Sequence, residues 1–278
     1  MSSYLHPTDG FDSPQIMGII NLSPDSFYPD SRMPGVSEAL KLAERMIEEG
    51  ADYLDVGAES SRPGAQPISE PEELAILLPT VERLCRDFPV PVSIDTYKPG
   101  VAQAVLDKGA AIINDITGLR YPEMAPIIAE YGAGVIIMHM QGTPENMQED
   151  VRYENCVEEI KSFLKNGIQA AEKAGISPDR IWVDPGIGFG KTIRHNLEIL
   201  AGLREFTSLK KPLMLGVSRK SFIGKILGIP VAERKEGSLA AAVVGVMHGA
   251  QILRVHDVRE TVHAVTIARE VMKVVHEK

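Results

Sequence analysis

Short apolar runs recur along the chain, and polar or glycine residues follow each one before the next segment with helical spacing. The runs cover residues 15–20, 53–56, 90–94, 111–113, 134–138, 181–183, 212–216 and 251–253. Helical periodicity is found at 37–48, near 70–86, from 99, near 153–173, around Leu197, Leu200 and Leu203, in two segments after 221, and up to about 275. Eight strand-like runs, at roughly 35 residues per unit, predict a single-domain α/β fold, the TIM (β/α)8 barrel.

An open, doubly wound sheet is the alternative arrangement for such alternation. It would usually need fewer strands, and it would confine its ligand groups to one switch point. Here polar residues end nearly every apolar run, as expected when eight loops surround one mouth. Because no linker rich in Pro, Gly or Ser divides the chain, we expect a leader over residues 1–14 and one barrel over residues 15–278.

Composition and charge argue against several classes of protein. The formal net charge of −9 disfavours nonspecific nucleic-acid binding, although a few cations around one cleft can still hold an anion. The apolar runs are far shorter than the ~20 residues of a membrane span, and the polar leader lacks the regions of a signal peptide. The two cysteines, Cys85 and Cys156, indicate packing residues in a reducing compartment. We therefore expect a cytoplasmic protein without a nucleic-acid or membrane partner. The spacing of the histidines predicts no zinc site.

The stretch from Trp182 to Lys191, Trp-Val-Asp-Pro-Gly-Ile-Gly-Phe-Gly-Lys, is the first candidate for a functional site. Asp184 ends a short buried strand there, and the glycines after it let the backbone come close to a ligand. An ordinary turn is the plain alternative, because Asp-Pro-Gly is a common turn signal. The glycines follow G-x-G-x-G and not G-x-G-x-x-G, which argues against a dinucleotide site.

Two kinds of side chain meet at the predicted mouth. Three strands end in hydrogen-bond acceptors, namely Asp95, Asn114 and Asp184. A possible basic cluster comprises Arg62, Lys191, Arg219, Lys220, Arg254 and His256, the last two on the same side of one strand. Each residue alone could be a solvated charge or a helix cap. Together they indicate a ligand with an aminated heterocycle at one end and an anion at the other.

Eight short motifs mark the ends of successive strands. They are MGIINLSPDSF (17–27), GAESSRPGA (57–65), SIDT (93–96), INDI (113–116), MHMQG (138–142), DPGIGFGK (184–191), SRKS (218–221) and LRVHD (253–257). In this order, over essentially all of the chain after the leader, they resemble the dihydropteroate synthase family of folate biosynthesis. The resemblance implies a transferase that joins 6-hydroxymethyl-7,8-dihydropterin diphosphate to 4-aminobenzoate and releases diphosphate. It also implies a magnesium ion, a homodimer formed through outer helices, and a target of sulfonamides.

The resemblance further assigns residues to the site. The pterin edge would be held by Asp95, Asn114, Asp184 and Lys220. The ring face and the diphosphate would be met by Arg254, His256, Asn21, Ser61 and Arg62, and Asn21 would also be the magnesium ligand. The aminobenzoate would be received by Phe189 and Ser221, and the substrate pocket would be lined by Met138 and Gly216. The family often has threonine at the positions of Ser23 and Ser61, and a more glycine-rich run at 28–32.

The resemblance leads to a mechanistic hypothesis, a dissociative displacement. The diphosphate would leave first, and Asp25 with the first loop would shelter the developing cation until the arylamine attacks.

Two other functions use the same residues. Lys220 could form a Schiff base in a barrel aldolase, which borohydride trapping of an adduct on this lysine would reveal. The barrel could instead bind a folate for a corrinoid methyl-transfer assembly, and tight binding of methyltetrahydrofolate would favour that reading. Such modules need a partner that carries cobalamin, and this chain has no separate domain for one.

Overall fold

The computed structural model describes residues 14–22 and 35–276, in which strands alternate with helices. The strands are β1 (Gln15–Asn21), β2 (Tyr53–Gly57), β3 (Val92–Asp95), β4 (Ile112–Asp115), β5 (Gly134–Met138), β6 (Ile181–Asp184), β7 (Met214–Leu215) and β8 (Ile252–Val255). The α-helices are α1 (Val36–Glu48), α2 (Glu70–Asp87), α3 (Pro99–Asp107), α4 (Met124–Glu130), α5 (Cys156–Lys173), α6 (Ile193–Ala201), α7 (Ser221–Leu227), α8 (Lys235–Met247) and α9 (Val258–His276). Short 3-10 helices are η1 (Pro178–Arg180), η2 (Leu203–Leu209) and η3 (Val231–Glu233).

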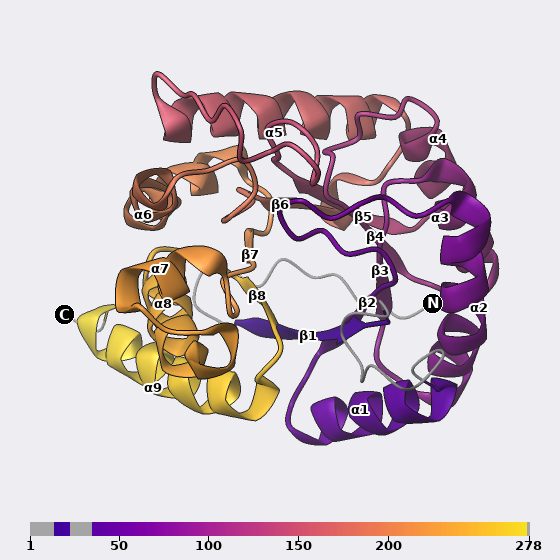
Figure 1. Ribbon diagram of the computed structural model, residues 1–278, viewed down its shortest axis with the longest axis horizontal. Coiled ribbons are helices and arrows are strands. Elements are labelled where there is room, and N and C mark those ends of the chain that lie inside the picture. Colours follow the sequence, from indigo (N-terminus) through magenta and orange to yellow (C-terminus); the bar gives the residue numbers. More distant parts are fainter. Residues whose placement is uncertain (1–13, 23–34, 277–278) are drawn as a thin grey trace.

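The strands form one parallel sheet in the order β6-β5-β4-β3-β2-β1-β8-β7. The two ends of this order meet, because Val183 of β6 forms a parallel bridge with Leu213 just before β7. The sheet is therefore a barrel with one narrow closing contact, and the helices lie around it as an outer ring (Figure 1). The predicted (β/α)8 barrel is confirmed, and an open doubly wound sheet is excluded.

Strand alternation divides the core into two parts. The larger part lies between the strands and the helices and includes Leu54, Val135 and Leu253, each fully buried. The smaller part fills the inside of the barrel with Met17, Tyr53, Ile112, Ile136, Trp182, Met214 and Ile252. The rings of Trp182 and Tyr53 pack edge to face, with centroids 5.2 Å apart. These large side chains close the barrel interior below the strand ends, so a ligand can enter only from the carboxyl-terminal face.

Several element boundaries differ from those predicted. Helix α5 begins at Cys156 and not near 153, because the side chain of Asn155 accepts from the backbone N–H of Glu158 and caps the helix there. Strand β7 has two residues where five were predicted. Leu197 is 46% exposed, so it lies outside the buried face of α6. None of the helices within the described ranges is long and apolar enough to cross a membrane. The predicted leader falls almost wholly on residues 1–13, outside the described residues.

Candidate active site

A layer of polar side chains lies directly above the apolar interior of the barrel. Side chains two residues apart on a strand face the same way. The residue two positions after each inward-facing core residue therefore also points into the barrel, one layer nearer the mouth. Two residues beyond the core residues of six strands stand Asp55, Asn114, Met138, Asp184, Gly216 and Arg254. Strand β3 adds Asp95, which pairs in register with Asn114. The candidate site is therefore a continuation of the barrel interior, and its position follows from strand periodicity.

Arg254 joins two acids that come from neighbouring strands. Its Nε donates to Asp55 Oδ2 at 2.6 Å, and its Nη2 donates to Asp95 Oδ2 at 2.8 Å. Asp55 is completely buried and also accepts from Asn114 Nδ2 at 3.3 Å. Asp55 thus binds both Arg254 and Asn114 and fixes their side chains in the layer.

Burial dominates the protonation chemistry of this cluster. It raises the pKa of Asp95 to about 7, although the nearby guanidinium of Arg254 pulls the value down. Burial would by itself lower the pKa of Arg254, but Asp55 and Asp95 raise it above its ordinary value, so Arg254 stays charged. The cluster therefore holds one permanent cation and an acid that can change its protonation near neutral pH.

Three buried polar atoms at this level have no hydrogen-bond partner among the described residues. They are Asn114 Oδ1, Asp55 Oδ1 and Ser93 Oγ. A buried acceptor left without a donor costs roughly 1–3 kcal/mol. Such atoms indicate a place where a ligand or water supplies the missing donors, and an amino-substituted heterocycle is rich in N–H groups.

Asp184 and Lys220 form the opposite side of the layer. Asp184 is 4% exposed, its Oδ1 accepts from the backbone N–H of Gly186 at 2.7 Å, and burial raises its pKa. Burial lowers the pKa of Lys220 to about 8, against the attraction of Asp184 and Asp95. Gly216 lies between the acid and the arginine, since a side chain there would stand 3.8 Å from Asp184 Oδ2 and 4.0 Å from Arg254 Cβ. Because glycine has no side chain, the space between Asp184 and Arg254 stays open.

An apolar rim borders the lysine. The Nζ atom of Lys220 lies 4.0 Å from the ring centroid of Phe189, a cation–π distance. Phe189 packs in a buried cluster with Ile116, Met138, Met140 and Met147. Met138 thus supports Phe189, and Met140 and Met147 are packing residues beside the mouth.

A third group joins the ends of β1 and β8. His256 has Asn21 Nδ2 at 3.4 Å from its Nε2 and Ser218 Oγ at 3.0 Å from its Nδ1. Because an amide nitrogen can only donate, Nε2 is the acceptor and the proton lies on Nδ1. Burial and, to a smaller extent, the neighbouring Arg254 and Arg219 lower the pKa of His256 to about 4, so the ring is neutral at pH 7.

The donors at this corner suit a magnesium ion that arrives with its own ligands. Mg²⁺ usually binds proteins through one or two oxygens and completes its shell with phosphate oxygens and water. No group of three or more His, Cys, Asp or Glu in residues 14–22 and 35–276 could hold a metal ion. Asn21 offers one neutral amide oxygen, while its Nδ2 lies beside His256. This fits an ion carried by a diphosphate and not a protein-enclosed metal centre.

Two members of the suggested basic cluster turn away from the mouth. Arg219 has a left-handed backbone conformation (φ 56°) and binds Asp257 through two hydrogen bonds of 3.0 and 2.6 Å. Lys191 is 3% exposed and points inward, where its Nζ donates to the carbonyl oxygens of His139 and Phe189. His139 accordingly lies under the loop rather than lining the cleft.

The remaining predicted residues lie on loops above the layer. Ser61 is partly exposed and Arg62 exposed in the β2–α2 loop, and Ser221 is exposed at the start of α7. For Arg62 the described part of the chain offers no ion-pair partner. Asp25, Ser23 and the 28–32 run lie outside the described residues.

Sequence reasoning missed the anchor of the β2–α2 loop. Glu59 accepts from Lys98 Nζ at 2.6 Å, from Tyr97 OH at 2.7 Å and from the backbone N–H of Ile68 at 3.0 Å. Lys98 also binds the buried Glu73. This network fixes both ends of the loop that carries Ser61 and Arg62. Sequence reasoning also missed Ser218, which binds His256. The place of Ser218 in the Ser-Arg-Lys-Ser motif was the signal that could have indicated it.

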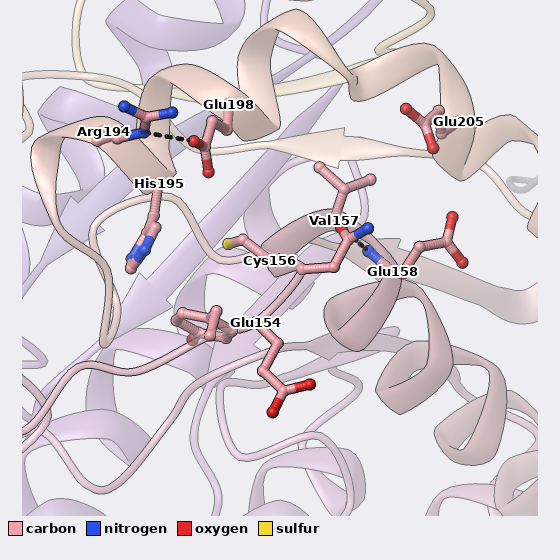
Figure 2. A pocket seen from close by; sticks show the side chains of 10 residues that line it. Glu154, Cys156, Val157, Glu158, Arg194, His195, Glu198 and Glu205 are labelled. Carbon is pink, nitrogen blue, oxygen red and sulfur yellow. Dashed lines mark hydrogen bonds and ion pairs between the residues drawn. The ribbon is translucent and has the colours of Figure 1, made fainter.

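A separate hollow lies between helices α5 and α6, outside the barrel. Its volume is about 540 Å³, and Figure 2 shows that Glu154, Glu158, Glu198 and Glu205 surround it. Arg194 forms an ion pair with Glu198 at 2.7 Å. None of the predicted site residues lines this hollow, so it is distinct from the strand-end site.

Comparison with known proteins places the site in a family context. The sequence pattern of the pterin binding enzymes matches residues 17–256. The chain is 45% identical to the dihydropteroate synthase of Escherichia coli K12 over 254 residues, 91% of this chain and 90% of the relative. A Yersinia pestis dihydropteroate synthase in complex with a sulfonamide drug superimposes with a TM-score of 0.90 at 42% identity, covering 95% and 96% of the two chains. A Xanthomonas albilineans dihydropteroate synthase with 4-aminobenzoic acid gives 0.88 at 41% identity, with 94% of each chain covered.

Proposed function

The chain belongs to the dihydropteroate synthase family of pterin-binding enzymes, and we propose that its strand-end residues carry out that family's reaction as follows. The enzyme is a transferase: it moves the dihydropterin-methyl group from 6-hydroxymethyl-7,8-dihydropterin diphosphate to 4-aminobenzoate and releases diphosphate. One observation carries the assignment of residues. The barrel mouth holds acceptors that are buried (Asn114, Asp184) or only 12% exposed (Asp95) beside cationic groups (Lys220, Arg254) within a single polar layer.

The pterin ring would lie on this layer. The amino and ring N–H groups of its edge match the carboxylates of Asp95 and Asp184 and the unpartnered Oδ1 of Asn114. The ring carbonyl matches the ammonium of Lys220. Gly216 leaves room for the ring between Asp184 and Arg254, and Arg254 would stack on its face.

The diphosphate would extend toward Arg254 and the His256 corner. The neutral His256 and the side chains of Asn21, Ser61 and Arg62 can add hydrogen bonds, and the helix N-termini on this face favour an anion. A magnesium ion bound with the diphosphate would be held by Asn21 and would stabilise the charge of the leaving group. Arg62, which is exposed here, would reach the anion through movement of its loop.

The displacement needs no protein nucleophile. The bond between the exocyclic methylene carbon and the diphosphate oxygen breaks, and its electron pair leaves with diphosphate. The arylamine lone pair then forms the new carbon–nitrogen bond, and the amine releases one proton to solvent. Arg254 stabilises the departing charge, while Phe189 and Ser221 hold the aminobenzoate in line. Asp25 stays a prediction of the family resemblance.

A direct assay tests this function. The purified chain is incubated with the pterin diphosphate, 4-aminobenzoate and magnesium, and dihydropteroate is followed by mass spectrometry together with released diphosphate. We expect equal amounts of both products. A well-folded preparation that forms neither would refute the proposal. Preferential binding of methyltetrahydrofolate in the same buffer would favour the corrinoid alternative.

We also propose that two copies associate through one side of the barrel. Exposed large apolar side chains of the described residues gather on helices α6 to α9 and η3, and only Tyr121 and Tyr131 lie elsewhere. The gathered residues are Ile193, Leu197, Ile226, Leu227, Val231, Val244, Met247, Ile267, Val271 and Val274. Figure 1 shows these helices together on the side opposite α2 and α3. These neighbouring helices pack on one another, and their exposed apolar side chains would together form an apolar patch, which is typical of a subunit interface.

The free thiols of Cys85 and Cys156 accord with a cytoplasmic location, which stays a prediction.

A further inference from the structure

The glycine-rich segment after β6, residues 185–191, is held in place through its carbonyl oxygens. Three consecutive carbonyls each accept a hydrogen bond from a different side chain: Gly188 from Gln148 Nε2 (3.0 Å), Phe189 from Lys191 Nζ (2.9 Å) and Gly190 from Tyr153 OH (3.0 Å). No strand or helix pairs these groups. Each donor therefore fixes one peptide plane of a segment that lacks regular structure.

Backbone conformation explains why the carbonyls are available. Gly186 and Gly190 have φ values of 69° and 61°, in the left-handed region that favours glycine. A side chain at Gly190 would stand 2.7 Å from the carbonyl oxygen of Gln141, and one at Gly186 would collide with the carbonyl of His139. The segment therefore lies directly against the backbone that follows β5.

Lys191 is the most deeply placed of the three donors. It is 3% exposed, and its Nζ lies within hydrogen-bond distance of three acceptors: Phe189 O (2.9 Å), His139 Nδ1 (2.9 Å) and His139 O (3.3 Å). Burial lowers the pKa of Lys191 to about 7, and its Nζ keeps at least two hydrogens to donate in either protonation state. Burial and the neighbouring Lys191 lower the pKa of His139 to about 2, so the imidazole is neutral and its Nδ1 can accept. Lys191 thus ties the peptide of Phe189 to the end of β5.

Phe189 is the residue of this segment whose side chain is expected to contact the substrate. It packs against Met138 and lies 4.0 Å from Lys220 Nζ. A shift of the Phe189 peptide would move the ring relative to both neighbours. We propose that Lys191 is a positioning residue that fixes Phe189 to receive the aminobenzoate, with Tyr153 and Gln148 in the same role. This inference rests on the proposed function, in which Phe189 contacts that substrate.

The first test separates the two substrates. Lys191→Met keeps the length of the side chain and removes every donor. We expect the KM for 4-aminobenzoate to rise by about tenfold or more, because a small misplacement of a substrate-holding group is costly, while the KM for the pterin diphosphate stays within about twofold. Lys211→Met is the matched control, since Lys211 is also a largely buried lysine that donates to a backbone carbonyl, that of Pro178. It should change neither constant.

A double-mutant cycle with Phe189→Ala tests whether Lys191 acts through the ring. If it does, Lys191→Met should add little to the KM for aminobenzoate once the ring is gone, because coupled residues are non-additive. Additive effects, or an equal rise in both KM values, would overturn the inference. If Lys191→Met does not fold, Tyr153→Phe carries the same cycle by removing a single oxygen. An inactive wild-type chain would instead overturn the proposed function, and the two failures are thereby distinguished.

Discussion

Arg254 donates from Nη2 to Asp95 Oδ2 at 2.8 Å, which joins the cation expected to meet the diphosphate to an acid expected to hold the pterin. The contact spans 159 positions of the sequence and exists because β8 and β3 both end at the barrel mouth. Without substrate, Arg254 and Asp95 therefore supply each other's hydrogen-bond partner. A pterin that binds Asp95 must share or replace this hydrogen bond, so the site exchanges the contact between Arg254 and Asp95 for contacts with the substrate.

Asp184→Asn should weaken binding of the pterin. The substitution keeps the shape of the side chain and removes the negative charge that is proposed to accept the hydrogen bonds of the pterin ring. The expected loss is roughly 1.5–3 kcal/mol, the range for hydrogen bonds to charged groups. Calorimetric titration with the pterin substrate measures it. Asp107→Asn, at the end of α3, removes a carboxylate of the surface and should leave the affinity unchanged.

Arg254→Ala should reduce both turnover and stability. Turnover should fall by at least about 10²-fold, because the charge that develops on the leaving diphosphate loses its cation. The free energy of unfolding should fall by about 3–5 kcal/mol, since Asp55 would be left fully buried without its ion-pair partner. Steady-state kinetics and urea denaturation measure the two effects.

The double variant Asp55→Asn/Arg254→Ala distinguishes the two roles. It should recover part of the lost stability, because the unpaired buried charge is gone, and none of the lost turnover. Recovery of turnover would contradict the role given to Arg254.

Much of the fold and of the candidate site could be predicted from the sequence, for a physical reason. Alternating apolar runs and helical segments specify a barrel, and residues at strand ends must then meet at one mouth. Asp95, Asn114, Asp184 and Arg254 follow from that rule alone, because position along a strand determines the face that a side chain occupies.

Contacts between distant strands could not be predicted in the same way. The bond from Arg254 to Asp55 depends on barrel closure and register, which no local pattern reports. Lys191 was expected in a basic cluster at the mouth, yet the turn after β6 directs it inward. Arg219 is likewise redirected, by a left-handed backbone and by Asp257. Sequence periodicity thus indicates which residues lie at the mouth, while loop conformation decides their partners.

The pH dependence of kcat/KM for the pterin diphosphate should report Lys220. Burial lowers its pKa to about 8, and the charged form, which we propose binds the ring carbonyl, predominates below that value. Activity should therefore fall as the pH rises through about 8. In Lys220→Arg the guanidinium stays charged, so this alkaline limb should move to higher pH. An unchanged limb would assign the titration to another group.

Asp95→Asn should change how stability depends on pH. Burial raises the pKa of Asp95 from 3.8 to about 7 in the folded chain. A raised acid pKa contributes stability that is complete below 3.8 and is lost as the pH rises through 7, because between these two values the unfolded chain has released a proton that the folded chain still holds. Relative to wild type, the variant should gain stability between pH 4 and pH 8 in urea denaturation. The exposed Asp150→Asn should show no such trend.

A charge in the apolar patch of α6 to α9 should separate the proposed dimer. Val271 is 53% exposed on α9, and Val271→Glu would place a carboxylate where the second copy excludes water. Light scattering after size exclusion should show a dimer for the wild-type chain and a monomer for the variant. Tyr131→Glu introduces the same charge at an exposed aromatic residue outside the patch and should leave the dimer intact. The candidate site residues lie at the mouth of the barrel, on strands β2 to β8 and away from Val271 on α9, so the Val271→Glu monomer should keep its affinity for the pterin. A wild-type chain that is monomeric at all concentrations would contradict the proposed dimer.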